Sequence, residues 1–180
     1  MSITLITGIQ AAGKSTIAQA VAERLPHSVH IRGDLFRRMI VNGRVEMGPA
    51  DPPAEAVRQL QLRYQLAAAA ADGYADAGFN VVLQDIILGD HLQWITQRIR
   101  TRPLSVVVLA PSASAVAVRD LERQRTRGKV AYKPGDEDIA ALDRALREST
   151  PRLGLWIDTS YLTVAETVDR ILAETATSQT

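Results

Sequence analysis

The sequence predicts an α/β domain in which helices cover both faces of a five-stranded parallel sheet. Short apolar runs that are typical of strands alternate with helical patterns along the 180 residues, as in sheets built with crossover helices. The first run leads directly into a glycine-rich loop and a helical pattern, which is the arrangement of a phosphate-binding unit. Because no repeat or linker interrupts this alternation, we expect one domain over residues 1–180.

The first strand is expected at residues 3–7, which are apolar and β-branched, and the first helix at 17–25. The loop between them matches G-x-x-x-x-G-K-S/T over residues 8–16 without a mismatch. Gly8 and Gly13 allow backbone angles and a close approach that a side chain would prevent. A chance glycine turn before an ordinary helix is the alternative, but the flanking strand and helix favour a phosphate-binding loop (P-loop).

The P-loop predicts how a nucleoside triphosphate and its metal would be held. Backbone amides of the loop are expected to point at the β-phosphate, and Lys14 is expected to reach the β- and γ-phosphates. The hydroxyl of Ser15 is placed to bind Mg²⁺. The predicted nucleotide-binding residues of this loop are Gly8, Ala11, Ala12, Gly13, Lys14, Ser15 and Thr16.

The second strand is expected at residues 28–32, and a helix is expected from Asp34 to about Val41. Residues 42–53 contain two glycines and three prolines, and we interpret them as a loop. Pro53 suits the first turn of a long helix that reaches Gly78.

The later elements continue the alternation. Ser112 is a suitable N-cap and Gly128 a suitable C′ residue for one helix, and a polar loop follows at 129–136. Thr163 and Glu166 form a capping box that opens the last helix, which we expect to fray after residue 174. The remaining expected strands are 79–85, 104–110 and 153–157, and the remaining expected helices are 91–101 and 137–148.

Two aspartates follow predicted strands at their carboxyl ends, where ligands bind in such sheets. Asp34 follows the second strand and could orient and deprotonate an acceptor hydroxyl; alternatively it caps the helix that it precedes, and both roles can coexist. Asp85 ends the third strand, where it could hold Mg²⁺ through water, bind acceptor hydroxyls or cap the next turn. The apolar run that ends in Asp85 favours a functional role for this residue.

Arg119, Arg123 and Arg127 are spaced by four and therefore share one helix face. A row of like charges repels slightly, and a bound triphosphate would relieve that repulsion. A solvated basic face is the alternative. The glycine and the basic loop that follow favour a lid over about residues 119–136.

Composition argues against several other classes of protein. The net charge of +1 argues against a main role in binding nucleic-acid backbones, and the absence of cysteine excludes disulfide and thiolate chemistry. The three histidines show no metal-ligand spacing. No signal-peptide pattern or membrane-length apolar run is found, so we expect a cytoplasmic protein without membrane partners. The sequence does not specify an oligomeric state.

With these residues assembled, the chain resembles the small P-loop kinases, and among them the chloramphenicol phosphotransferase-like group, over residues 3 to about 172. Three segments beyond the P-loop carry the resemblance, namely RGDL at 32–35, VLQDIILG at 82–89 and RQRTRG at 123–128. They are similar to that family's strand-two motif with its catalytic aspartate, its apolar strand ending in aspartate, and its arginine-bearing lid.

The resemblance implies a three-layer P-loop kinase fold with a small lid, and transfer of the γ-phosphoryl group of ATP, with Mg²⁺, to a hydroxyl of a small molecule such as an antibiotic. Asp34 would be the base, and Arg123 and Arg127 would act with Lys14 on the phosphates. Arg37 lies one turn beyond Asp34 and is a candidate acceptor contact. We expect the acceptor to meet the segment 34–78.

Residues 42–49 and the helix after them differ from that family's antibiotic-binding segment, so the acceptor is not identified by the sequence. The same set of motifs also resembles kinases that phosphorylate other hydroxyls. These are polynucleotide 5′-hydroxyl kinases, zeta-type toxins that act on nucleotide sugars, and sugar-acid kinases. A nucleotide-dependent switch without catalysis is the alternative from another class. Against it, no Asn-Lys-x-Asp motif of the kind that reads the base in G proteins follows a strand.

Overall fold

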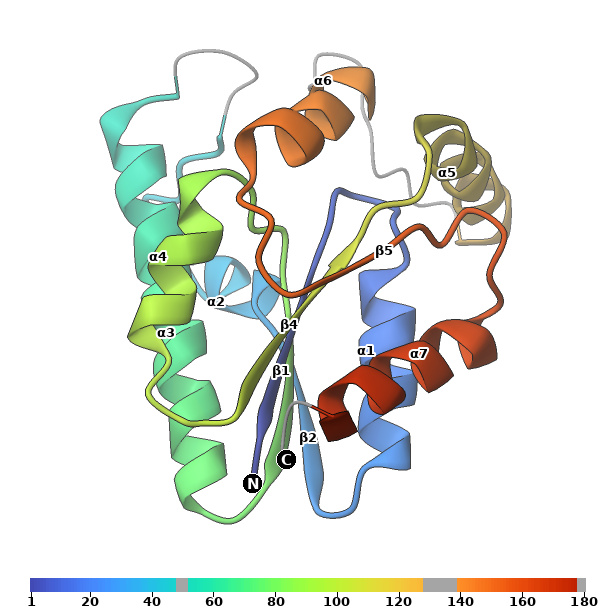
Figure 1. Cartoon of the computed structure of the whole chain (residues 1–180). Coiled ribbons are helices and arrows are strands. Elements are labelled where there is room, and N and C mark those ends of the chain that lie inside the picture. Colours follow the sequence, from blue (N-terminus) through green and yellow to red (C-terminus); the bar gives the residue numbers. More distant parts are fainter. Residues whose placement is uncertain (48–51, 128–138, 178–180) are drawn as a thin grey trace.

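The computed structural model describes residues 1–47, 52–127 and 139–177 (Figure 1). Its strands form one five-stranded sheet in the order β2-β3-β1-β4-β5, and every neighbouring pair is parallel. The predicted fold class is therefore confirmed. The strands are β1 (Ile3–Thr7), β2 (Ser28–Arg32), β3 (Asn80–Gln84), β4 (Leu104–Leu109) and β5 (Leu155–Ile157).

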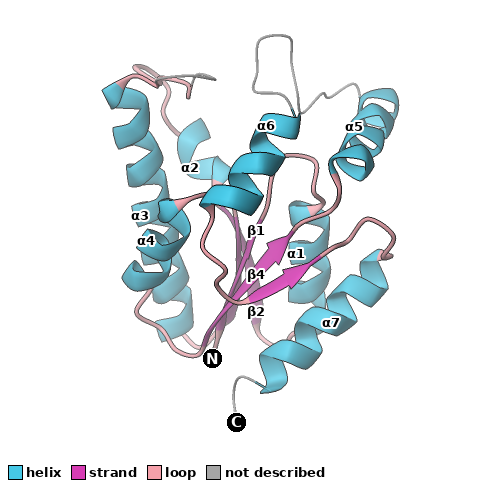
Figure 2. Cartoon of the chain, turned by 45° about the horizontal axis from the view of Figure 1, so that its top comes forward, coloured by secondary structure: helices cyan, strands magenta, loops and turns pink. Residues whose placement is uncertain are grey.

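Helices cover both faces of this sheet (Figure 1). α1 and α7 pack together on one face, α3 and α4 pack together on the other, and α2 packs against α3. Figure 2 shows α5 and α6 towards the carboxyl ends of the strands. The helices are α1 (Lys14–Arg24), α2 (Asp34–Arg38), α3 (Ala54–Asp76), α4 (Asp90–Arg98), α5 (Ala113–Arg127), α6 (Ile139–Arg144), the π-helical turn η1 (Ala145–Ser149) and α7 (Val164–Thr177).

Several helix boundaries differ from the sequence prediction; α2, for example, ends at Arg38 rather than at about Val41. Two of the other differences have a clear physical reason. α1 begins at Lys14 rather than at residue 17, because Gly13, with φ of 95°, turns the chain directly into the helix. α4 ends at Arg98 rather than at residue 101, because the amides of Arg100 and Thr101 donate to the carboxylate of Asp72 on α3 instead of continuing the helix.

Smaller differences concern the elements after the lid segment. The helix expected at 137–148 is divided, within the described residues, into α6 and η1, and the last helix continues to Thr177. Two of the predicted caps are present: Ser112 accepts from the amide of Ala115, and Thr163 and Glu166 exchange the bonds of a capping box. Gly128, the predicted C′ residue, lies outside the described residues.

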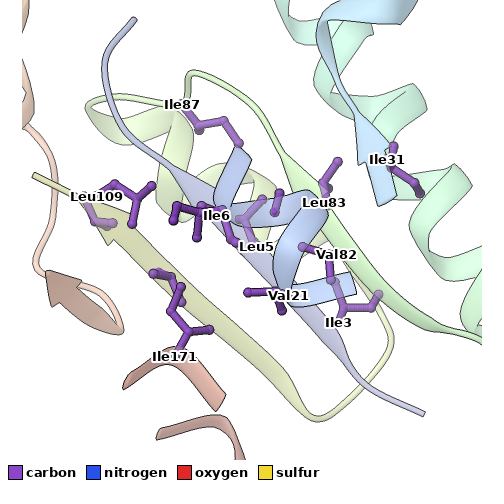
Figure 3. Close-up of a cluster of buried hydrophobic side chains, with 14 of the residues drawn as sticks. Ile3, Leu5, Ile6, Val21, Ile31, Val82, Leu83, Ile87, Leu109 and Ile171 are labelled. Carbon is purple, nitrogen blue, oxygen red and sulfur yellow. The ribbon is translucent and has the colours of Figure 1, made fainter. Parts of the chain in front are cut away.

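The core lies on both sides of the central strand β1. Every residue of β1 is buried, and Ile3, Leu5 and Ile6 are fully buried among side chains of β3, β4 and α1 (Figure 3). On the α3 side, four alanines of the helix are buried against this core, which allows the helix to lie close to the sheet: Ala67, Ala68, Ala71 and Ala75. None of the described helices is both long and apolar enough to cross a bilayer.

The contact between α3 and the end of α4 supplies a stability prediction. Asp72 is buried and accepts hydrogen bonds from Arg100 N, Thr101 N and Thr101 Oγ1. Burial raises the pKa of Asp72, but the hydrogen bonds together lower it by more than burial raises it. The net pKa therefore lies below its usual 3.8. The stabilisation is therefore complete above pH 3.8 and is lost as the pH falls further below that value.

We expect Asp72→Ala to lower the free energy of unfolding by about 1–3 kcal/mol at pH 7, because two backbone amides lose their acceptor. Urea unfolding at pH 7 and at about pH 3 measures this difference, which should shrink at the lower pH. Asp76→Ala is the matched control, since that side chain lies one turn further along α3 and is exposed. Equal effects of the two variants at pH 7 would contradict the prediction.

Candidate active site

The P-loop joins the end of β1 to the start of α1 and has the backbone shape of an anion cradle. A Cβ atom on Gly8 would lie 2.5 Å from the carbonyl oxygen of Leu109 on β4, so only glycine fits there. Ala11 and Gly13 have φ values of 59° and 95°, in the left-handed region. Successive turns of this kind direct backbone amides into a common concavity, which is suited to a phosphate group.

Lys14 is the first residue of α1 and is buried. Its Nζ donates a 2.6 Å hydrogen bond to the carbonyl oxygen of Ile9, so the side chain folds back over the loop. Ser15 and Thr16 follow it and are exposed, and the first turn of α1 carries no acidic side chain. The positive end of the helix dipole is therefore left for a ligand of negative charge.

The carboxyl ends of the three strands that carry the predicted site lie in one row. Arg32 at the end of β2 is in register with Gln84, and Gln84 is in register with Ile6 on β1. The amide of Gly33 donates to Gln84, and that of Asp85 donates to Ile6. The structure thus brings Asp34, Asp85 and the P-loop to the same edge of the sheet, as the sequence predicted.

Asp34 is the first residue of α2, and Gly33 occupies the N-cap position. The alternative of a capping side chain is wrong, since no side chain caps this helix. One carboxylate oxygen, Oδ2, accepts a 2.5 Å bond from Nη2 of Arg38, and Oδ1 lies 3.8 Å from Nε of Arg32. Oδ1 is itself buried and has no hydrogen-bond partner among the described residues.

An oxygen in this position has lost water without gaining a donor, which is costly unless a ligand supplies one. The guanidinium groups of Arg32 and Arg38 hold the carboxylate in place from two sides. Asp34 can therefore receive one more hydrogen-bond donor, and an alcohol hydroxyl is a donor of the right size.

Asp85 is almost completely buried and is paired with Arg63 of α3. Nε of Arg63 donates to Oδ2 at 2.7 Å and its Nη2 donates to Oδ1, which also accepts from the amide of Ile86 at 2.8 Å. A Cβ atom on Gly33 would collide with the Asp85 carboxylate, so glycine is required beside it. Asp85 thus closes the next turn and anchors Arg63, while its own carboxylate lies against Gly33, the residue before Asp34.

Arg63 is the buried residue of this site that the sequence reasoning missed, and Arg38, which contacts Asp34, was missed as well. The signal for Arg63 was its position on α3, seven residues after Ala56 and four before Ala67, both of which are buried. This spacing places Arg63 on the core-facing stripe of the helix, where an arginine needs a partner. Tyr64, the next residue, donates to the carbonyl oxygen of Ile86 at 2.6 Å, and burial raises its pKa to about 12.

The other predicted arginines lie on two sides of the site. Arg37 forms an ion pair with Glu46, and Nε of Arg44 lies 3.0 Å from the same carboxylate. Arg119 on α5 donates to the carbonyl oxygens of Ala12 at 3.4 Å and Thr159 at 2.5 Å, and so links the P-loop to the segment after β5.

The predicted lid is only partly described. The backbones of Arg123 and Arg127 belong to α5, but their side chains and residues 128–138 lie outside the described part of the chain. Their predicted contacts with a triphosphate therefore stay a prediction.

The comparisons with known proteins concern the family and the fold of the chain. A family model described as AAA domain matches residues 3–151, whereas the comparison with curated proteins gave no match. A sugar kinase from Janibacter sp. HTCC2649 superposes with a TM-score of 0.72 and 17% identity, over 98% of this chain and 95% of that chain.

Two further solved structures have the same fold. A tunicamycin resistance protein from Deinococcus radiodurans gives a TM-score of 0.64 and 21% identity, over 97% of this chain and 95% of that chain. A gluconokinase from Sinorhizobium meliloti 1021 gives a TM-score of 0.60 and 19% identity, over 98% and 92%. The chain has a P-loop kinase-like fold, and it belongs to the AAA domain family.

Proposed function

We propose that this chain is a kinase that transfers the γ-phosphoryl group of ATP to an alcohol hydroxyl of a small molecule. The observation that carries the proposal is the Asp34 carboxylate, which has one oxygen held by Arg38 and the other buried without a hydrogen-bond partner among the described residues. It lies at the same sheet edge as the P-loop. A base beside a phosphate cradle is what a kinase requires, whereas a nucleotide switch has no use for it.

On the nucleotide side, the amides of the P-loop hold the β- and γ-phosphates, and Lys14 exchanges its bond to Ile9 for one to the phosphates. Arg119, Arg123 and Arg127 on α5 stabilise negative charge as the phosphoryl group moves. The positions of the first two turns of α5, above the P-loop, support this arrangement because Arg119 already contacts Ala12.

The chain also fits Mg²⁺ of the kind that travels with a nucleotide. No group of three or more acidic or histidine side chains suited to a metal is found among the described residues, and Ser15 offers an exposed hydroxyl beside the cradle. Mg²⁺ in such sites keeps few protein ligands and takes most of its oxygens from phosphates and water. When bound, it would neutralise charge on the β- and γ-phosphates.

On the acceptor side, Asp34 orients the hydroxyl through Oδ1 and accepts its proton as the oxygen attacks the γ-phosphorus. Both oxygens of Asp85 are already bound by Arg63 and the amide of Ile86. We therefore assign Asp85 to the acceptor side, where it anchors Arg63, because a role as a direct metal ligand would break that buried pair.

The activities by which two of the similar structures are named support an alcohol acceptor without identifying it. These two are a sugar kinase and a gluconokinase. The third is a tunicamycin resistance protein. We therefore retain an antibiotic as a candidate acceptor in the proposal, in line with the chloramphenicol phosphotransferase-like prediction.

Lys14→Ala tests the nucleotide half of this proposal. We expect ATP binding to weaken and acceptor-stimulated ADP release to fall by about 100-fold or more, because a positive charge aimed at the transferred group is removed. Calorimetry with ATP and Mg²⁺, together with coupled ADP release across sugars, sugar acids, antibiotics and nucleotide sugars, measures both effects. Arg24→Ala is the matched control, since Arg24 ends the same helix and pairs with Asp169 on the surface. A fully active Lys14→Ala variant would contradict the P-loop assignment.

A further inference from the structure

Arginine side chains gather around Asp34 in greater number than the sequence alone indicates. Arg32 and Arg38 contact its carboxylate, and Arg37 and Arg44 share Glu46 close by. Arg63 approaches from α3 through Asp85, which packs directly against Gly33. We call these residues the arginine cluster: Arg32, Arg37, Arg38, Arg44 and Arg63.

The members of the cluster interact with one another electrostatically. Burial lowers the pKa of Arg63, and the positive charges of Arg37 and Arg38 lower it further, whereas Asp34 raises it. Charges act in this way only when they are close, because water and salt screen distant ones. α2 and α3 also pack against each other, so Asp34, Arg37 and Arg38 on α2 share one site with Arg63 on α3.

The cluster carries more positive charge than its described carboxylates neutralise. Its five guanidinium groups meet the carboxylates of Asp34, Glu46 and Asp85 among the described residues, which leaves a local surplus of two positive charges. The whole chain carries a net charge of only +1. The surplus is thus concentrated at the acceptor side of the site rather than spread over the surface.

Donor groups of the cluster also remain available to a ligand. Arg63 uses Nε and Nη2 on Asp85, and no described residue accepts a hydrogen bond from its Nη1. Its side chain keeps 12% of its surface exposed, and that of Arg38 keeps 57%. A guanidinium group that is held rigidly and still exposes N–H groups is suited to a planar carboxylate or to phosphate oxygens.

We infer that the acceptor is a small hydroxylated anion, with a carboxylate or phosphate group close to the hydroxyl that is phosphorylated. This inference rests on the proposed kinase activity and specifies its substrate class. Arg38 and Arg63 bind the anionic group, while Oδ1 of Asp34 takes the hydroxyl. A neutral acceptor of the same shape would leave the positive surplus uncompensated and would bind less well.

Matched acceptors that differ only in the anionic group test this inference. Glycerol, glycerate and glycerol 3-phosphate form one set, and sorbitol, gluconate and 6-phosphogluconate form another. Coupled ADP release with ATP and Mg²⁺ gives kcat/KM for each member, and we expect an anionic member to exceed its neutral match by about tenfold or more. Comparing the carboxylate members with the phosphate members identifies the anionic group. A 5′-hydroxyl oligonucleotide is included as a macromolecular anion.

The Arg38→Gln variant assigns any preference to the cluster. We expect the ratio of kcat/KM for the anionic member to that for its neutral match to fall by about tenfold. A loss of folded protein or of Asp34 reactivity lowers kcat/KM for both members equally, so it does not change this ratio. Arg24→Gln removes an arginine of similar exposure, at the end of α1, that pairs with Asp169 of α7, and it should leave the ratio unchanged.

The possible results distinguish a failure of the anionic-acceptor inference from a failure of the proposed kinase activity. Turnover of neutral members that equals or exceeds that of anionic members would leave the kinase standing and overturn the anionic acceptor. Stimulation by the oligonucleotide alone, or an anion preference that Arg38→Gln leaves intact, would overturn it as well. No acceptor-dependent ADP release with any member would count against both the inference and the proposed activity.

Discussion

Asp34→Asn is expected to lower acceptor-stimulated ADP release by about 10²–10⁴-fold, the range that a positioned general base contributes. Asparagine keeps the size of the side chain but cannot accept the proton of the attacking hydroxyl. ATP binding should stay close to that of the parent protein, because Asp34 belongs to α2 and does not contact the P-loop in the described structure. Steady-state kinetics and ATP calorimetry on the same preparation measure both results.

Asp90→Asn is the control for this variant. Asp90 also opens a helix directly after a glycine N-cap, but it lies in α4 and is exposed. Its replacement should leave turnover unchanged. Turnover of Asp34→Asn that matches the parent protein would remove Asp34 as the base, and loss of ATP binding in that variant would point to a structural role instead.

Arg63→Met is expected to lower the free energy of unfolding by about 3–5 kcal/mol, because it leaves the Asp85 carboxylate buried and unpaired. The double variant Arg63→Met with Asp85→Asn should recover most of this loss, since the remaining amide carries no charge and still accepts from the amide of Ile86. Urea unfolding of the parent protein, of each single variant (Arg63→Met and Asp85→Asn) and of the double variant gives the coupling energy of the pair.

Arg58→Met on the same helix provides the comparison. The side chain of Arg58 is 75% exposed and pairs with Glu55, so its loss should change stability by no more than about 0.5 kcal/mol. If Arg63→Met cost no more than Arg58→Met, the Arg63–Asp85 pair would not be the buried anchor that the structure describes. The double variant should remain folded but should lose preference for anionic acceptors, because it removes one of the two arginines assigned to that group.

The site shows which kinds of residue a sequence can place. Lys14, Asp34 and Asp85 were found because each stands next to a strand or loop whose pattern is local, and parallel strands bring their carboxyl ends together. Arg37 was placed near the acceptor by helical spacing, and its ion pair with Glu46 shows that it also holds the following loop. Arg63 was not predicted because its partner, Asp85, is 22 residues away in the sequence and outside α3.

The sequence by itself determined the α/β class, the parallel sheet and the phosphate cradle, because these depend on hydrophobic periodicity and on glycines within a few residues of one another. The tertiary structure alone decided that Arg38 holds one oxygen of Asp34, that the other is buried with no hydrogen-bond donor in the described part of the chain, and that Arg63 occupies both oxygens of Asp85. Such contacts depend on how α2 and α3 pack at the sheet edge. No local pattern specifies the distance between side chains that separate elements bring together.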